Sequence, residues 1–140
     1  MMLYIGSDKP LSIIPFNKQV PGFHTETLSD NDAKVAAHFS TEYVLYAGSS
    51  EGCGCGFQHA LTDNGSWLNV VEEEEDPYRR NMSQLFEYVA GIITNGGRVE
   101  LYACWDGEFA DKPMSTELIS YKELVDKDFY LKEKGFYTLH

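Results

Sequence analysis

One segment of the chain repeats apolar residues at the spacing of an amphipathic α-helix. Its apolar positions lie three or four residues apart, at Met82, Leu85, Phe86, Val89, Ile92 and Ile93. Pro77 suits the first turn of a helix, Asp76 can cap it, and Gly96–Gly97 ends it. The acidic run Glu72–Asp76 then lies beside the helix N-terminus, where negative charge is favourable. The pattern therefore predicts a helix over Pro77–Asn95.

Other segments alternate apolar and polar residues with the period of a β-strand, or are apolar throughout. They are Leu3–Gly6, Phe23–Leu28, Tyr43–Ala47, Phe57–Leu61, Trp67–Val71, Arg98–Trp105, Glu117–Ser120, Asp128–Leu131 and Gly135–Leu139. The pair Asn64–Gly65 predicts a tight hairpin turn between the fourth and fifth of these segments, and the last two predict a final hairpin.

Two shorter helices are predicted from their capping residues. The first follows Leu28, where Ser29 and Asp32 resemble a capping box. The second follows Ser120, which can form a capping box with Glu123. Hairpins combined with two to three helices predict an α+β fold, with the helices packed on a mostly antiparallel or mixed sheet.

Length and composition favour one folded domain over residues 1–140. A chain of 140 residues with 43% hydrophobic and 14% aromatic residues can bury a substantial core. The segments Tyr43–Ala47 and Val99–Cys104 are apolar enough to be central strands, covered on both faces. We therefore expect the Pro77–Asn95 helix to pack across a sheet that contains both.

The charge balance limits the classes of partner. The net charge is −11, from 22 acidic and 11 basic residues, and only three of the basic residues are arginines. Nucleic acids and anionic membranes attract clustered lysine and arginine, so neither is an expected partner. A basic protein partner suits this charge better. The first residues carry no basic, apolar signal sequence, and the three cysteines cannot all pair, which together favour a cytoplasmic location.

The stretch GSSEGCGCGF, Gly48 to Phe57, is the main candidate for chemistry. If it is extended, Cys53 and Cys55 share one face of a strand and the glycines leave the other face open to close backbone approach. Packing of two reduced, unmetallated thiols is then the simplest interpretation. A phosphate cradle is excluded, because no phosphate-binding glycine motif and no basic residue are present.

Two chemical alternatives remain open for this stretch. His59 continues the alternation, and together with Cys104 from another strand the two cysteines could bind zinc or copper. One residue between two ligands is tight for zinc, whose close pairs are usually separated by two to four residues. Alternatively, Cys53 and Cys55 could close a small, strained disulfide ring, and strained disulfides are the labile ones.

Trp105 and Asp106 form a second, weaker candidate. They end a predicted strand in the sequence CWDGE, where strand ends and loops often carry binding pockets. A buried tryptophan followed by an ordinary Asp-Gly turn explains the same residues. No catalytic motif is recognisable elsewhere. The sequence therefore favours a non-catalytic interaction or ligand-binding domain without a cofactor, with a thiol redox or metal-binding protein as the alternative.

Three segments together resemble a family of small bacterial proteins to which no function is attached. They are LYIGSDKP, EGCGCGF and ELYACWDG, and they lie between Leu3 and Gly107. The resemblance implies a bacterial, cytosolic origin and supplies no activity or site.

Overall fold

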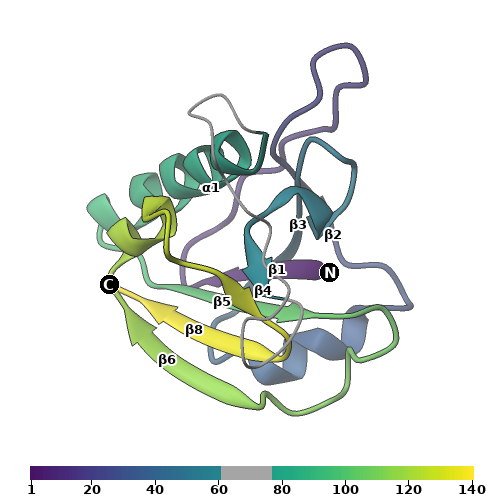
Figure 1. Ribbon diagram of the computed structural model, residues 1–140. Helices are drawn as coiled ribbons and strands as arrows, with labels where there is room; N and C mark the ends of the chain where they lie inside the picture. The colour runs from purple at the N-terminus through teal and green to yellow at the C-terminus, as the bar shows by residue number, and fades with distance from the viewer. Residues whose placement is uncertain (61–76) are drawn as a thin grey trace.

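A six-stranded mixed sheet forms the centre of the computed structural model, which describes residues 1–60 and 77–140 (Figure 1). The strand order is β2-β3-β1-β5-β8-β6, and all neighbours are antiparallel except β6 and β8, which are parallel. The strands are β1 Met2–Ser7, β2 His24–Thr27, β3 Tyr43–Gly48, β5 Val99–Cys104, β6 Ser115–Ile119 and β8 Gly135–Leu139. The mixed sheet and the α+β class agree with the prediction from the sequence.

The two strands predicted to be central are interior strands of the sheet. β3 lies between β2 and β1, and β5 lies between β1 and β8. All six residues of β5 are buried, as are the last four of β3. Their apolar sequences fit this place because both faces of the sheet are covered there.

Only one α-helix is present among residues 1–60 and 77–140. It is α1, Pro77–Thr94, which ends one residue before the predicted boundary. The two shorter predicted helices are single stretches of 3-10 helix, η1 Ala33–His38 and η3 Tyr121–Val125, so the expectation of two to three packed helices is corrected. At six and five residues, both are longer than the three or four residues that 3-10 helices usually reach, but far shorter than α1. The capping box of Ser120 and Glu123 is confirmed at the start of η3.

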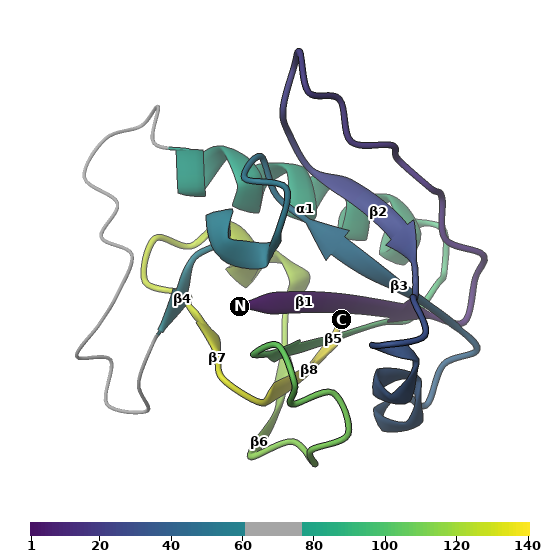
Figure 2. The same ribbon diagram turned by 90° about the vertical axis from the view of Figure 1, so that its right-hand side faces the viewer.

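The sheet lies between two covering layers (Figure 2). On one face, α1 and η3 cover the alternate residues of the central strands that include Leu3, Ile5 and Leu101. On the other face, η1 and the segment after β5 cover Tyr4 and Tyr102. Alternation of side chains along each strand explains why neighbouring residues of β1 enter different cores.

The predicted final hairpin is wrong. The segment before β8 contributes β7, Leu131–Lys132, which pairs in parallel with β4, His59–Ala60. β8 cannot pair with β7 because β5 and β6 occupy both of its edges. The chain therefore leaves β7 through a turn in which Lys134 has a φ of 53° before entering the main sheet.

Several further expectations fall on residues 61–76, outside the described residues. They are the Asn64–Gly65 hairpin turn, the Trp67–Val71 strand, the last residue of the Phe57–Leu61 strand, and the Asp76 cap. Among the described residues, no helix has the length and the apolar character that crossing a bilayer requires.

Candidate functional site

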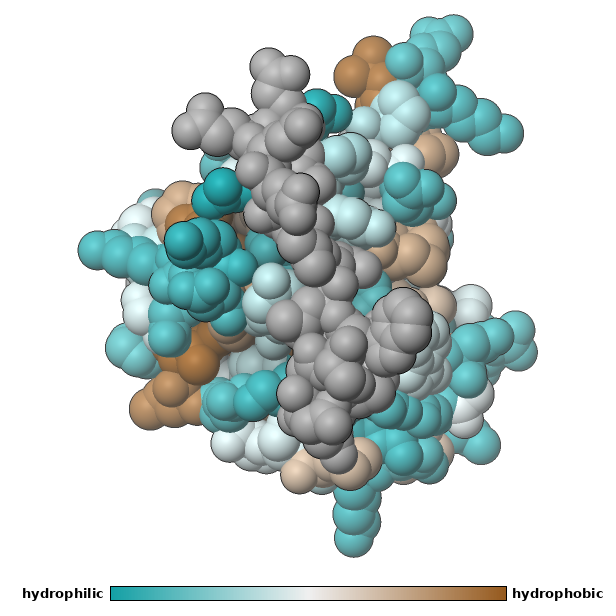
Figure 3. Space-filling view, in the orientation of Figure 1, coloured by the Kyte–Doolittle hydropathy of each residue, from teal (hydrophilic) through white to brown (hydrophobic). Residues whose placement is uncertain are grey.

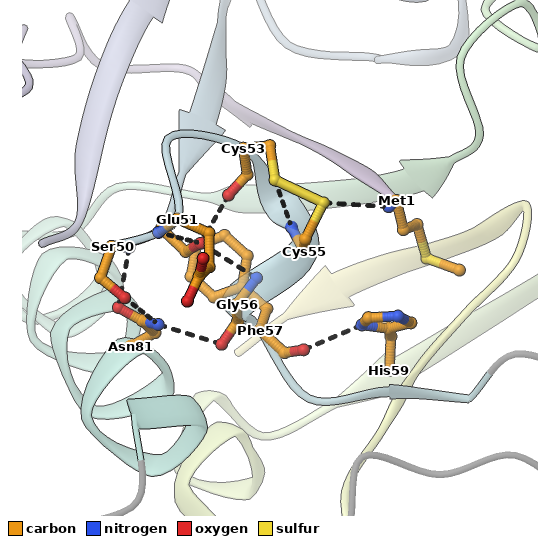
Figure 4. The surroundings of a disulfide bond; sticks show 10 residues. Met1, Ser50, Glu51, Cys53, Cys55, Gly56, Phe57, His59 and Asn81 are labelled. Atoms are coloured by element: carbon orange, nitrogen blue, oxygen red, sulfur yellow. Dashed lines mark hydrogen bonds between the residues drawn. A yellow bond between two sulfur atoms is a disulfide. The ribbon is translucent and has the colours of Figure 1, made fainter.

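Cys53 and Cys55 are joined by a disulfide in a turn that follows β3 (Figure 4). The prediction of two reduced thiols on or beside a strand is therefore wrong about their reduction, and the pair lies beside the end of β3 rather than on a strand. Residues Gly54–Gly56 form a short 3-10 helix, η2, rather than an extended segment. This turn brings the two Cα atoms to 5.3 Å, within the range that a disulfide spans.

Ser49, the residue after β3, ties the two ends of the turn together. Its backbone nitrogen donates to the Cys53 carbonyl at 2.8 Å, and its hydroxyl donates to the same oxygen at 2.5 Å. The hydroxyl oxygen also accepts the Gly56 N–H at 3.0 Å. One buried serine thus fixes the backbone at Cys53 and immediately after Cys55.

Asn81 holds the same turn from α1. Its side chain is fully buried, and its Nδ2 donates to the Gly56 carbonyl and to the Ser50 hydroxyl, both at 3.0 Å. Its Oδ1 accepts the Ser50 N–H at 3.1 Å. Asn81 was not among the residues predicted from the sequence, although a signal exists: it precedes Leu85 and Val89 at helical spacing, so it is a polar residue in the buried stripe.

Gly54 lets the turn approach β1 closely. A Cβ atom at this position would overlap the Met1 carbonyl oxygen and would lie 3.1 Å from the Leu3 nitrogen. The close backbone approach predicted for the flanking glycines is therefore seen at Gly54. The turn is held on three sides, by Ser49, by Asn81 and by the backbone of β1.

The two sulfur atoms have different surroundings. Cys55 is exposed and Cys53 is half-buried. The Cys55 N–H donates to the Cys53 sulfur at 3.3 Å, and the Met1 nitrogen lies 3.9 Å from the Cys55 sulfur (Figure 4). Although only one residue separates them, the two cysteines therefore differ in exposure, and their sulfurs differ in hydrogen-bond donors.

The other two predicted metal ligands do not join the cysteine pair in one ligand set. His59 is buried at the start of β4, and its Nδ1 lies 2.9 Å from the Phe57 carbonyl oxygen. Cys104 is a free, fully buried thiol in the core on the opposite face of the sheet from α1. Among residues 1–60 and 77–140, no three His, Cys, Asp or Glu side chains lie together as a metal site. The zinc or copper site formed by all four residues remains a prediction.

His59 gives the protein a specific sensitivity to acid. Burial lowers the pKa of His59 below its ordinary value near 6.5. Below pH 6.5 the unfolded chain takes up a proton at His59, whereas the folded protein does so only near the lowered pKa. The free energy of unfolding therefore falls as the pH falls between these two values. The loss is at most about 1.4 kcal/mol per pH unit and ends at the lowered pKa.

Urea denaturation at pH 7.5 and pH 5.5 measures this loss. We expect the wild-type protein to lose more stability between the two values than His59→Gln does, while His140→Gln, at an exposed position, behaves as wild type. Equal losses in the wild type and His59→Gln would show that His59 does not contribute.

Trp105 and Asp106 lie in an exposed turn. Trp105 is 37% exposed, so the expectation of a buried tryptophan is wrong. Its backbone nitrogen is held by the Glu108 carboxylate at 2.8 Å, and Gly107 has a φ of 90°, which a turn of this kind requires. Three surface hollows of about 270, 360 and 530 Å³ lie instead beside β2 and the segment that precedes it. None of these three is lined by Trp105 or Asp106.

Comparison with models of protein families, with curated proteins and with solved structures finds no significant match. The geometry of the site is therefore the main evidence for its function. That geometry is an accessible disulfide in a turn whose backbone is fixed by contacts other than the disulfide.

Proposed function

We propose that the protein carries out reversible thiol–disulfide exchange at Cys53 and Cys55. The observation that supports this proposal most is the exposed position of Cys55 within a turn held by Ser49 and Asn81. A reactive disulfide must be reached by another thiol, and its two cysteines must stay close together after reduction. The exposure of Cys55 supports the first condition, and the hydrogen bonds of Ser49 and Asn81, which do not involve the sulfurs, support the second.

A purely structural role does not explain this disulfide well, because it closes a very short loop and adds little stability. In the chain-entropy model, a closed loop of three residues stabilises a fold by only about 1.6 kcal/mol, against roughly 3 kcal/mol for a loop of fifteen residues. The turn already has several hydrogen bonds that do not involve the sulfurs. The disulfide therefore adds little rigidity, which supports a chemical role for the pair.

The proposed reaction transfers two electrons from two thiols to the disulfide. A thiolate of a small thiol such as glutathione, or of an exposed protein cysteine, attacks one sulfur and forms a mixed disulfide, and the other sulfur leaves as a thiolate. A second thiolate then attacks the outer sulfur of the mixed disulfide. The products are the oxidised partner disulfide and the reduced Cys53–Cys55 dithiol, and the reverse sequence returns both electrons.

The predicted cytoplasmic location fits this proposal. Disulfides in a reducing compartment are usually transient and serve catalysis or redox sensing rather than stability. The expectation of a basic protein partner stays a prediction from the net charge of −11. Hydrophilic residues cover most of the coloured surface in Figure 3, and its hydrophobic residues lie in small separate groups. A charged partner suits such a surface and is compatible with exchange chemistry at the turn.

Cycling of the native protein tests the proposal. Dithiothreitol should reduce the pair and raise the mass by about 2 Da, the two hydrogens of a dithiol, and oxidised glutathione should reverse this change. The far-ultraviolet circular dichroism spectrum should stay the same throughout, because Ser49 and Asn81 still hold the turn. A pair that resists reduction in the folded protein, or that fails to reoxidise, would contradict the proposal.

A further inference from the structure

The two sulfurs of the turn are not equivalent, and their surroundings assign them different roles. We infer that an incoming thiolate attacks Cys55 and that Cys53 is the sulfur that leaves and later resolves the mixed disulfide. This inference rests on the proposed exchange function and names the order of events at the same site. It is drawn from accessibility and from the hydrogen bonds to each sulfur.

Accessibility favours Cys55 as the attacked atom. A thiolate approaches a disulfide along the S–S axis, on the side away from the leaving sulfur, so the attacked sulfur must face open solvent. Cys55 is exposed, whereas Cys53 is half-buried. The carbonyl of Cys53 is also held by Ser49, which keeps the backbone of this residue against the end of β3.

The hydrogen bond inside the turn favours Cys53 as the leaving sulfur. When the S–S bond breaks, the electron pair remains on the leaving sulfur as a thiolate. The Cys55 N–H already donates to the Cys53 sulfur at 3.3 Å, so a stabilising donor is in place before the charge develops. The donor nearest to the Cys55 sulfur is the Met1 amino group, which is farther away, at 3.9 Å, and burial lowers the pKa of this amine and so reduces its positive charge.

Both directions of the reaction then use the same geometry. In reduction of the pair, the thiolate RS⁻ bonds to the Cys55 sulfur, the S–S bond breaks and Cys53 becomes a thiolate. In the reverse step, the Cys53 thiolate attacks the Cys55 sulfur, re-forms the disulfide and releases RS⁻. The fixed backbone from Cys53 to Gly56 keeps this thiolate beside its target, because both of its ends are tied to the Ser49 hydroxyl.

Single-cysteine variants test the assignment. Cys53→Ser leaves Cys55 as the reactive thiol, and Cys55→Ser leaves Cys53. Each folded variant is mixed with oxidised glutathione, and the rate at which glutathione is added is followed by mass spectrometry. After each rate is divided by the thiolate fraction of that cysteine, taken from the pH dependence of its reaction, we expect glutathione to add to Cys55 at least about fivefold faster than to Cys53, because the remaining difference is access to the sulfur. A smaller ratio, or faster addition to Cys53, would overturn the assignment.

Two further measurements keep the outcome unambiguous. Circular dichroism confirms that each variant folds, and Cys53→Ala and Cys55→Ala replace any serine variant that does not. Cycling of the wild-type protein is measured in the same buffers. If the wild type cycles but the ratio is small or reversed, the order of attack is wrong and the exchange function stands. If the wild type does not cycle, the exchange function itself fails.

Discussion

After reduction, the folded protein should react with an alkylating reagent at Cys53 and Cys55 long before Cys104 reacts. Cys104 is fully buried, and burial together with the nearby Glu108 carboxylate raises the pKa of this thiol to about 12. At pH 8 the thiolate fraction of a thiol with that pKa is roughly a thousandfold lower than that of an ordinary thiol with a pKa near 8.5. The expected difference in alkylation rate is therefore on the order of a thousandfold or more.

Peptide mapping by mass spectrometry measures these rates separately. Before reduction, neither cysteine of the turn should be labelled, because both are held in the disulfide. In concentrated urea all three thiols should be labelled at similar rates after reduction, which controls for the intrinsic reactivity of each peptide. Labelling of Cys104 within tenfold of the turn cysteines in the folded protein would mean that its burial is transient.

Replacement of Gly54 by alanine should destabilise the protein markedly. The added Cβ would overlap the Met1 carbonyl oxygen, and neither backbone can move freely because the turn is tied to Ser49 and β1 is an interior strand. Overpacking of this kind costs about 1–3 kcal/mol of unfolding free energy. Urea denaturation of the oxidised protein measures the loss.

Gly91→Ala is a matched control for this substitution. Gly91 lies on the exposed side of α1, and a Cβ there would meet no atom within 4 Å. Alanine in a helix interior is more favourable than glycine by up to about 1 kcal/mol, so this variant should be as stable as the wild type or more so. A Gly54→Ala protein as stable as Gly91→Ala would show that the turn does not press against β1.

Local patterns predicted those parts of the fold whose partners are determined by burial. The apolar stripe of α1 and the continuous apolar sequence of β5 can each be buried in only one secondary structure. The bounds of both elements were therefore predicted to within one residue at each end. The Ser120–Glu123 capping box was predictable because it involves residues three apart. Contacts between neighbours in sequence are the ones that a pattern can show.

Contacts between distant segments explain the failures. Nothing in residues 128–139 shows that β8 pairs with β5 and β6 while β7 pairs with β4, since those partners lie elsewhere in the chain. The alternation of Cys53 and Cys55 matches a strand, yet Ser49 and Asn81 hold the segment as a turn. The Asn81 hydrogen bonds require α1 to pack beside the turn, and no local pattern shows that packing.

The midpoint of the Cys53–Cys55 couple in glutathione redox buffers tests the proposed exchange most directly. The folded protein is equilibrated over a series of ratios of reduced to oxidised glutathione, acid-quenched, and alkylated to count oxidised pairs by mass. We expect a reversible two-electron transition with a midpoint above about −300 mV, where labile and catalytic disulfides lie. The same midpoint should be reached from the reduced and from the oxidised protein. A pair that remains oxidised below about −300 mV, as structural disulfides do, would contradict the exchange function.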